Sequence, residues 1–248
     1  MTRVLCVANQ KGGVGKTTTA VNLGAGLAKA GLQTLLIDLD PQCNATTGLG
    51  LVPTDRHALV VQRPLREAIV ATYLEGLHLL PGSRSFQDVE VLAKGEEGEA
   101  KTLRQHLTSG MNAFDVVIVD CPPSLGPLTQ AALSASTEVL MPIQCEYYAM
   151  EGLTQMIQVI RNAMQSGGGR LEFGGILLTM VDESLELTHE VEREVREFFG
   201  EIVFETVIPR DVAVCEAPSH GRSVLDYEPA CRGTWAYLEL CQEILEMN

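Results

Sequence analysis

The sequence predicts an α/β fold: a doubly wound, mostly parallel β-sheet with helices on both faces. Short apolar runs of strand length alternate with longer segments of helical period, which is typical of βαβ units. The short runs lack polar alternation, as expected of strands that helices cover on both sides. In addition, a glycine-rich loop joins the first apolar run directly to a helical segment. This order places the loop at the carboxyl end of a strand.

The expected elements follow one another along the whole chain. Strands are predicted at residues 4–8, 34–37, 77–80, 116–119, 139–142, 174–179 and 203–207, and helices at 16–30, 64–72, 125–135, 151–164, 188–199 and 233–246. Two stretches break the pattern, the solvated GEEGE at 95–99 and SGGG at 166–169. Neither has flanks that would fold independently, so we expect one domain spanning residues 1–248.

Composition narrows the class of protein. With 248 residues, 46% of them hydrophobic and 20% charged, the chain can bury a full core. The formal charge is −14, of which residues 170–248 carry −11, and this argues against an intrinsically nucleic-acid-binding or anionic-membrane-binding surface. The seven cysteines are widely spaced without a C-x-x-C pair, which predicts reduced thiols. Neither a signal peptide nor an apolar run long enough to cross a membrane is evident, so we expect a cytoplasmic protein.

The glycine-rich loop has the chemistry of a phosphate site. It reads NQKGGVGKTT at residues 9–18, between a strand and a helix N-terminus. Gly12, Gly13 and Gly15 allow backbone N–H groups to converge on phosphate oxygens. Lys16 is placed to reach the β- and γ-phosphates, and the Thr17 hydroxyl to coordinate Mg²⁺. One feature departs from the standard phosphate loop: Gln10 stands where a glycine is expected, and a second lysine, Lys11, follows it.

Three carboxylates follow buried strands. Asp38 and Asp40 end the run LLIDLD, two residues apart and therefore on one side of an extended chain. Asp120 ends the run VVIVD, an arrangement that predicts an acceptor for Mg²⁺-bound water. Ligands of open α/β sheets bind outside the carboxyl ends of the strands, so these residues are candidates for the site of the loop.

The motifs together resemble the ParA/MinD superfamily of P-loop ATPases, and its ParA/Soj branch more than MinD. The resemblance rests on KGGVGKTT at residues 11–18, DLDPQ-x-NATTGLG at 38–50, DCPPSLG at 120–126, QCEYYAMEGL at 144–153 and VIPRDVAVCEAPSHG at 207–221. It covers nearly the whole chain and implies the P-loop NTPase fold, ATP and Mg²⁺ as cofactors, and an ATP-dependent homodimer.

The resemblance also implies roles for single residues. Lys11 would reach the phosphates of the partner's ATP, Asp38 would support the magnesium shell, and Asp40 would position the attacking water. Catalytic residues are then Lys11, Lys16 and Asp40, and metal-site residues are Thr17, Asp38 and Asp120. The nucleotide-binding residues are Lys11, Gly12, Gly13, Val14, Gly15, Lys16, Thr17, Thr18 and Pro209, the last in a segment that cradles adenine in this family.

Two positions depart from the family where its members bind DNA nonspecifically. The resemblance leads us to expect arginines after the IPR segment and after the strand ending in TM-x-D, but the chain has Ala213 and Ser184. Since nonspecific DNA affinity comes mostly from neutralised phosphates, weakened DNA binding is one hypothesis. A local stripe of arginines hidden by the global charge is the alternative, and the sequence leaves DNA binding open. Cys43, where the family usually has glycine, is either a neutral change or one that alters the neighbouring loop.

The resemblance implies slow hydrolysis stimulated by a ParB-like or cargo-adaptor protein, and segregation or positioning of DNA or another cargo. A membrane platform is not expected, because the C-terminal segment carries three glutamates, which anionic lipid would repel. A regulatory switch acting on a protein partner, without DNA or membrane, is the alternative function. An iron–sulfur carrier with the same loop is disfavoured, because Cys121 follows Asp120 directly.

Overall fold

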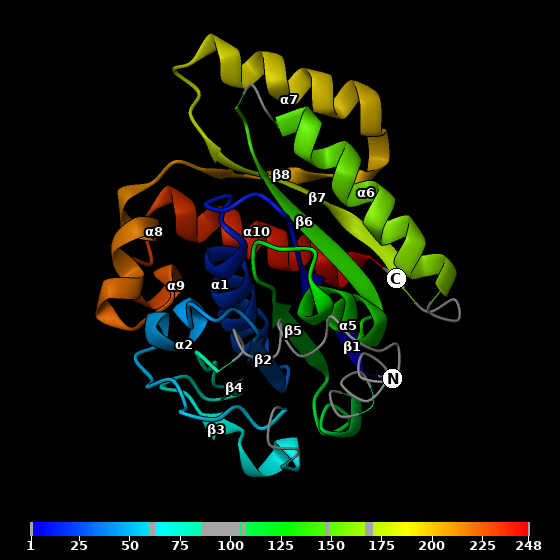
Figure 1. Ribbon diagram of the computed structural model, residues 1–248. Helices are drawn as coiled ribbons and strands as arrows, with labels where there is room; N and C mark the ends of the chain where they lie inside the picture. Colours follow the sequence, from blue (N-terminus) through cyan, green and yellow to red (C-terminus); the bar gives the residue numbers. More distant parts are fainter. Residues whose placement is uncertain are drawn as a thin grey trace.

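A computed structural model describes residues 2–59, 63–85, 105, 108–146, 149–166 and 171–247. Its centre is an eight-stranded sheet with the order β3-β4-β2-β5-β1-β6-β7-β8 (Figure 1). All neighbouring strands pair in parallel except β3 and β4, which are antiparallel. The strands are β1 (Arg3–Val7), β2 (Thr34–Asp38), β3 (Val70–Ala71), β4 (Leu77–Leu80), β5 (Val116–Asp120), β6 (Glu138–Gln144), β7 (Glu172–Val181) and β8 (Val203–Pro209).

Helices cover both faces of the sheet, as the buried strand runs predict. One core lies under α1 (Lys16–Lys29) and α10 (Arg232–Glu246), and the other under α5 (Pro127–Ala135), α6 (Ala149–Ser166) and α7 (Glu186–Phe199) (Figure 1). Shorter helices complete the chain: α2 (Asn44–Gly48), α8 (Val212–Glu216), α9 (Val224–Tyr227), η1 (Leu65–Glu67), η2 (Gly200–Ile202) and η3 (Ala217–His220). The predicted doubly wound fold is therefore confirmed.

One predicted helix is wrong. Residues 64–72 form only the 3₁₀ turn η1 and the short edge strand β3, which pairs with β4 through Val70 opposite Leu79. Three of the four residues from Ile69 to Thr72 are β-branched, which favours strand over helix. The Thr72 hydroxyl also donates to the Leu77 carbonyl at 2.9 Å, closing the hairpin.

The remaining expectations concern the short helices, the two breaks in the pattern, the cysteines and membrane spans. The short helices α2, α8 and α9 were not predicted, since four or five residues carry too little periodicity to show a face. The predicted break at 95–99 and residues 167–169 of the second break lie outside the described residues. All seven cysteines are free, as predicted. Among the described helices, none combines the length and apolar character that a membrane span needs.

Candidate functional site

The site lies at the carboxyl ends of β1, β2 and β5, which are neighbours in the order β2-β5-β1. Register places Asp38 of β2 beside Asp120 of β5, and Asp120 beside Val7 of β1. The chain then turns to the other half of the sheet, because β6 pairs with the opposite edge of β1. The loop after β1 therefore sits at the topological switch point, where open α/β sheets bind ligands.

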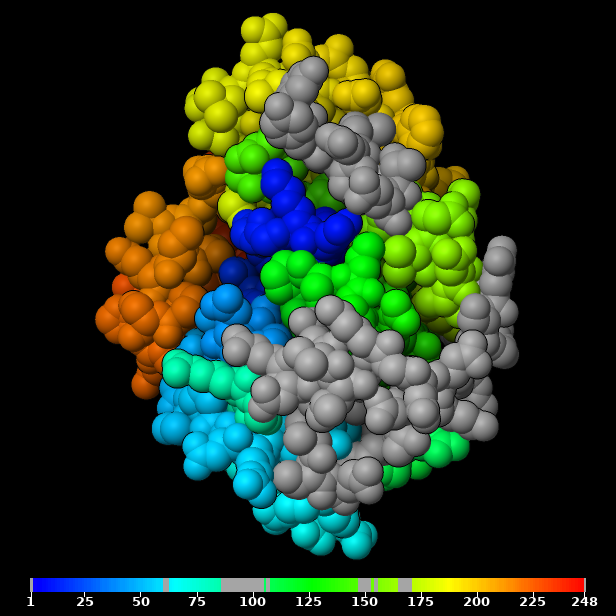
Figure 2. All heavy atoms as spheres, in the orientation of Figure 1, coloured from blue at the N-terminus to red at the C-terminus, as the bar shows by residue number. Residues whose placement is uncertain are grey.

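The backbone of the phosphate loop has the conformation that its glycines predict. Gly13 and Gly15 have φ angles of 76° and 86°, in the region that favours glycine, and Gly15 is the N-cap of α1. The loop is held from behind by the buried Thr179, whose hydroxyl lies 2.9 Å from the carbonyl oxygens of both Val14 and Ile143. In Figure 2 the loop, in dark blue, reaches the surface in the middle of the face shown. Its backbone is thus fixed but accessible.

Lys16 points back under this loop. It is buried, and its Nζ donates to the Lys11 carbonyl at 2.8 Å. Burial lowers the pKa of the ammonium, while the charges of Asp120 and Asp40 raise it. Lys16 is therefore a cation held close to the carboxylates of the site.

The second lysine of the loop faces outward. Lys11 Nζ lies 3.3 Å from Glu146 Oε2, and the two side chains are 37% and 51% exposed. Gln144 donates from Nε2 to the other oxygen of Glu146 at 2.6 Å. Such an exposed ion pair contributes little stability, so Lys11 can leave it at small cost.

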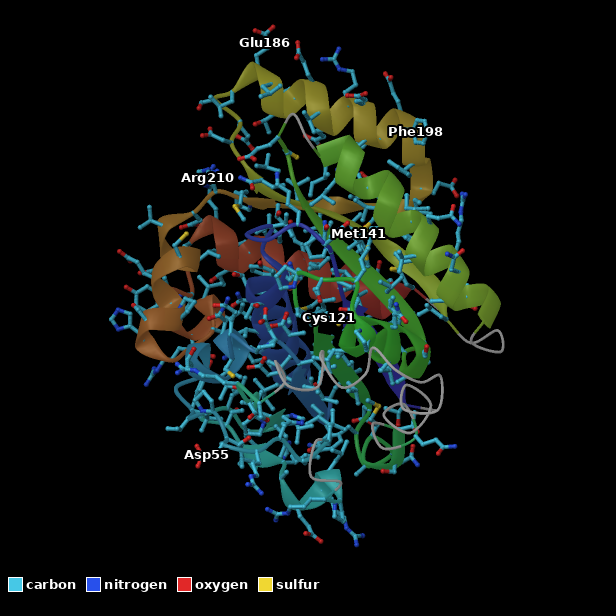
Figure 3. All side chains as sticks on the ribbon, in the orientation of Figure 1. Asp55, Cys121, Met141, Glu186, Phe198 and Arg210 are labelled. Atoms are coloured by element: carbon cyan, nitrogen blue, oxygen red, sulfur yellow. The ribbon has the colours of Figure 1, made fainter. Side chains whose placement is uncertain are left out.

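Asp120 lies at the bottom of the site, fully buried beside Cys121, which Figure 3 shows in the middle of the molecule. Among the described residues, no donor has full hydrogen-bonding geometry to either carboxylate oxygen, although the Thr17 hydroxyl is close enough to interact with the group. Burial raises the pKa of Asp120 well above its ordinary value and repulsion by Asp38 raises it further, while the nearby Thr17 hydroxyl and Lys16 lower it. A buried carboxylate without partners is costly, and a cation such as Mg²⁺ beside it supplies what is missing. The site fits a magnesium ion.

Hydrogen bonds from neighbouring residues of the chain hold the Asp38 side chain in place. Its Oδ2 accepts hydrogen bonds from the Thr46 amide at 2.9 Å and the Thr46 hydroxyl at 2.6 Å, and its Oδ1 accepts one from the Asp40 amide at 3.2 Å. Burial nevertheless raises its pKa to about 6, which the Thr46 bonds limit. Gly82 packs so closely that a Cβ there would lie 2.8 Å from the Asp38 carboxyl carbon. Asp38 is thus oriented from two sides.

Asp40 opens the turn that leads into α2. The side chain is buried, and its Oδ1 accepts from the Gln42 amide at 2.8 Å. Cys43 follows with φ of 57°, one of two non-glycine residues with positive φ among those described. Burial and the neighbouring Asp38 raise the pKa of this thiol to about 11. The φ of Cys43 is a left-handed backbone conformation, which a glycine would adopt more easily.

An apolar pocket lies beside the phosphate loop. Its volume is about 150 Å³, and Gly15, Thr18, Pro209, Val214 and Pro218 are among the residues that line it. The predicted adenine-contact residue Pro209 and the loop residue Thr18 thus share one cavity. Such a mostly apolar slot next to a phosphate loop suits a nucleotide base.

Comparisons with known proteins agree with this geometry. Residues 2–173 match the AAA domain family. The chromosome partitioning protein ParA of Caulobacter vibrioides is 44% identical over 254 residues, which cover 98% of this chain and 94% of that protein. This chain belongs to the ParA/Soj family of ATPases. The sporulation initiation inhibitor protein Soj of Bacillus subtilis is 42% identical, with 98% of each chain covered.

A solved structure shares the fold of this ParA/Soj member. It is described as cobyrinic acid a,c-diamide synthase from Mycobacterium smegmatis with bound ADP and magnesium. The two chains superpose with a TM-score of 0.85 at 35% identity, with 99% of this chain and 94% of that chain covered. The predicted resemblance and fold class are both confirmed.

The two positions that depart from the family follow the ends of the paired strands β7 and β8, and Arg210, labelled in Figure 3, directly follows β8. The Ala213 amide donates to Asp211 Oδ1 at 2.9 Å as α8 begins, and Ser184 donates from both its amide and its hydroxyl to Asp182 Oδ1. Hydrogen bonds from Ser184 lower the pKa of Asp182, and the positive charge of Arg210 contributes. Arg210 and Arg232 thus both lie near an acidic side chain in this part of the molecule.

Sequence reasoning missed three residues that build this ParA/Soj site. Thr46 orients Asp38, Thr179 holds the phosphate loop, and Glu146 receives Lys11. Thr46 and Glu146 both stand inside motifs that carry the resemblance, so their positions were visible but their contacts were not. Thr179 contacts Val14 across 165 residues, and no local pattern reveals such a pair.

Proposed function

We propose that this protein forms an ATP-dependent sandwich dimer, hydrolyses ATP slowly, and thereby drives segregation or positioning of DNA or another cargo. ATPase activity with ATP and Mg²⁺ as cofactors accompanies membership of the ParA/Soj family. The single observation that carries the proposal is the fully buried Asp120, whose oxygens receive no well-formed hydrogen bond from the described residues, at the end of the strand beside the phosphate loop. A cation bound together with phosphate would offset the cost of burying this carboxylate.

Each side chain has a role that its surroundings support. The loop amides and Lys16 bind the phosphates, while Thr17 and Asp120 hold the cation, with Asp38 oriented behind them. Bound Mg²⁺ supplies neutralisation of phosphate charge. Asp40, fixed by the Gln42 amide, orients the attacking water. Pro209 and Thr18 line the cavity for the base.

Dimerisation is supported by the placement of Lys11. This lysine is not needed to hold its own loop through its side chain, since its Nζ lies in a half-exposed pair with Glu146. The face that carries it also presents the phosphate loop at the surface (Figure 2). A second copy on this face would receive Lys11 beside its own phosphates, and hydrolysis would then depend on the dimer.

The activating partner is proposed to be a ParB-like or cargo-adaptor protein. The named relatives include chromosome partitioning proteins of two bacteria and Soj of a third. A formal charge of −14 suits a basic segment of such a partner. Partitioning of a chromosome would place the protein in the cytoplasm.

We also propose that this protein binds DNA more weakly than the family resemblance implies. Ala213 and Ser184 stand where the family resemblance predicts arginines, and Arg210 lies next to Asp182 at the same edge. Four phosphate contacts fewer per dimer would reduce both the affinity and its salt dependence. This observation also favours the second candidate, a regulatory switch that acts on a protein partner without DNA.

The test is retention of the Asp40→Ala variant on plasmid DNA at physiological salt with ATP. This variant should bind ATP and dimerise without turnover, and only weak retention is expected. Lys16→Ala, which should lose nucleotide binding, is the matched control. Tight ATP-dependent retention would contradict weakened DNA binding, and wild-type turnover by Asp40→Ala would contradict the role of Asp40.

A further inference from the structure

The loop that carries Lys11 leaves β1 at a point where the neighbouring strand β6 continues. The last residue pair between these two strands is Val7 with Leu140, and the Ala8 amide donates to the Leu140 carbonyl at 3.1 Å. Carbonyls two residues apart on a strand point to the same side, so the carbonyl of the buried Pro142 also faces the space that β1 has left. A buried carbonyl there needs a donor that β1 no longer supplies.

Asn9 supplies this donor. It is only 5% exposed, and its Nδ2 donates to the Pro142 carbonyl at 2.8 Å. Its Oδ1 accepts from the Lys11 amide at 3.0 Å, two residues further along the chain, which is the pattern of an Asx turn. Asparagine suits this place because its side-chain amide carries both a donor and an acceptor. One buried side chain therefore joins β6 to the start of the phosphate loop.

The backbone of Lys11 is held on both sides. Its amide donates to Asn9, and its carbonyl accepts from Lys16 Nζ at 2.8 Å. Its side chain is held much less firmly, since the Nζ atom lies 3.3 Å from an oxygen of the exposed Glu146. Lys11 thus combines a fixed backbone with a side chain that can change its partner.

We propose that Asn9 is a positioning residue, which fixes the backbone of Lys11 so that this lysine reaches the phosphates bound by a second copy of the chain. The inference rests on the proposed function, in which Lys11 acts across the dimer. A long side chain makes a distant contact more readily when its own backbone is already ordered, because less conformational freedom is lost on contact. When the Lys16 ammonium turns to bound phosphate, Asn9 still ties this backbone to β6.

The first measurement is kcat and KM for ATP hydrolysis by the full chain, together with its affinity for ADP. Asn9→Ala should lower kcat about tenfold, the scale of one lost hydrogen bond, because Lys11 is then less ordered. KM and the affinity for ADP should stay close to wild-type values, since the chain keeps its own phosphate loop. Asn9→Ser keeps an acceptor near the Lys11 amide and should recover part of kcat.

Asn22→Ala is the matched control. Asn22 is 3% exposed, and its side chain also makes two hydrogen bonds, donating to the Thr18 carbonyl and accepting from the Val224 amide. Its loss should lower the melting temperature about as much as Asn9→Ala does, without a comparable loss of kcat.

The second measurement is the dissociation constant of the ATP-bound dimer, obtained by sedimentation in the Asp40→Ala background, which is expected to hold ATP without turnover. Asn9→Ala should raise this constant about tenfold, while Asn22→Ala should leave it unchanged.

The outcomes separate the alternatives. A raised KM or a weakened affinity for ADP with kcat unchanged would overturn the proposal in favour of a role in binding the chain's own nucleotide. Equal losses of kcat in Asn9→Ala and Asn22→Ala, or no recovery in Asn9→Ser, would also overturn it. An unchanged dimer dissociation constant in Asn9→Ala would overturn the inference and leave the proposed function standing. A monomeric Asp40→Ala protein in the presence of ATP would instead contradict the proposed function, and the inference with it.

Discussion

Thr46 is predicted to be the positioning residue on which the orientation of Asp38 depends. Its hydroxyl donates to Asp38 Oδ2 at 2.6 Å and accepts from the Gly82 amide at 2.8 Å, all inside the core. Thr46→Val keeps the shape but removes both bonds. A hydrogen bond to a charged group contributes about 1.5–3 kcal/mol, and a buried amide left without a partner costs about 1–3 kcal/mol. The free energy of unfolding should therefore fall by about 3 kcal/mol.

The measurement is urea unfolding followed by circular dichroism, with ATP hydrolysis measured on the same preparations. Thr46→Ser keeps the hydroxyl and should retain most of the stability and turnover. Thr47→Val is the matched control, because within the described ranges the exposed Thr47 hydroxyl bonds only to local backbone carbonyls. A positioning role further requires that Thr46→Val raise the Mg²⁺ concentration for half-maximal hydrolysis. If Thr46→Val unfolds within about 0.5 kcal/mol of Thr47→Val, the reasoning is refuted.

Three further changes test other parts of the structure. Burial raises the pKa of Asp226, but hydrogen bonds, first that of Lys29, hold it below the ordinary value, so Asp226→Asn should cost about 1 kcal/mol at pH 7. That difference should shrink in melting curves as pH falls below about 4 and vanish below the lowered folded-state pKa of Asp226, since the contribution is full above the unfolded pKa and is lost through the folded one. Gly26→Ala places a Cβ 2.3 Å from Cys241 Sγ and should cost about 1–3 kcal/mol, recovered in part by Cys241→Ala in a double-mutant cycle; additive costs would contradict the clash. Asp120→Asn should raise the melting temperature of the nucleotide-free protein and abolish hydrolysis, and a lowered melting temperature would argue that Asp120 has partners.

The sequence predicted those parts of the fold that depend on local pattern. The runs that became β1, β2 and β5 are apolar except at their end residues. The loop of residues 9–16 contains its own conformational requirements in Gly13 and Gly15. Because a strand, a glycine loop and a helix follow one another directly, no distant contact is needed to recognise them.

Elements that depend on contacts between distant residues were missed. The strand β3 exists because Thr72 closes a hairpin with Leu77, while the same residues also fit a short helix by period. Arg222 meets the Tyr73 ring only after the chain has folded, because the two residues lie far apart in sequence. Such contacts have no local signature, since each residue alone reads as an ordinary surface side chain.

The paired carboxylates connect stability to function at this site. Asp38 and Asp120 lie opposite each other on adjacent strands and are both fully buried. Burial raises the pKa of both carboxyl groups, and the charge of Asp38 raises the pKa of Asp120 further. Two buried carboxylates side by side destabilise the empty protein, because repulsion and desolvation both oppose their ionisation. A bound cation reverses both effects, and any ligand that binds only the folded state stabilises it further. We propose that the free energy lost to this repulsion and burial is recovered on binding Mg²⁺ with ATP, which would couple the order of the β2 and β5 ends to the nucleotide state.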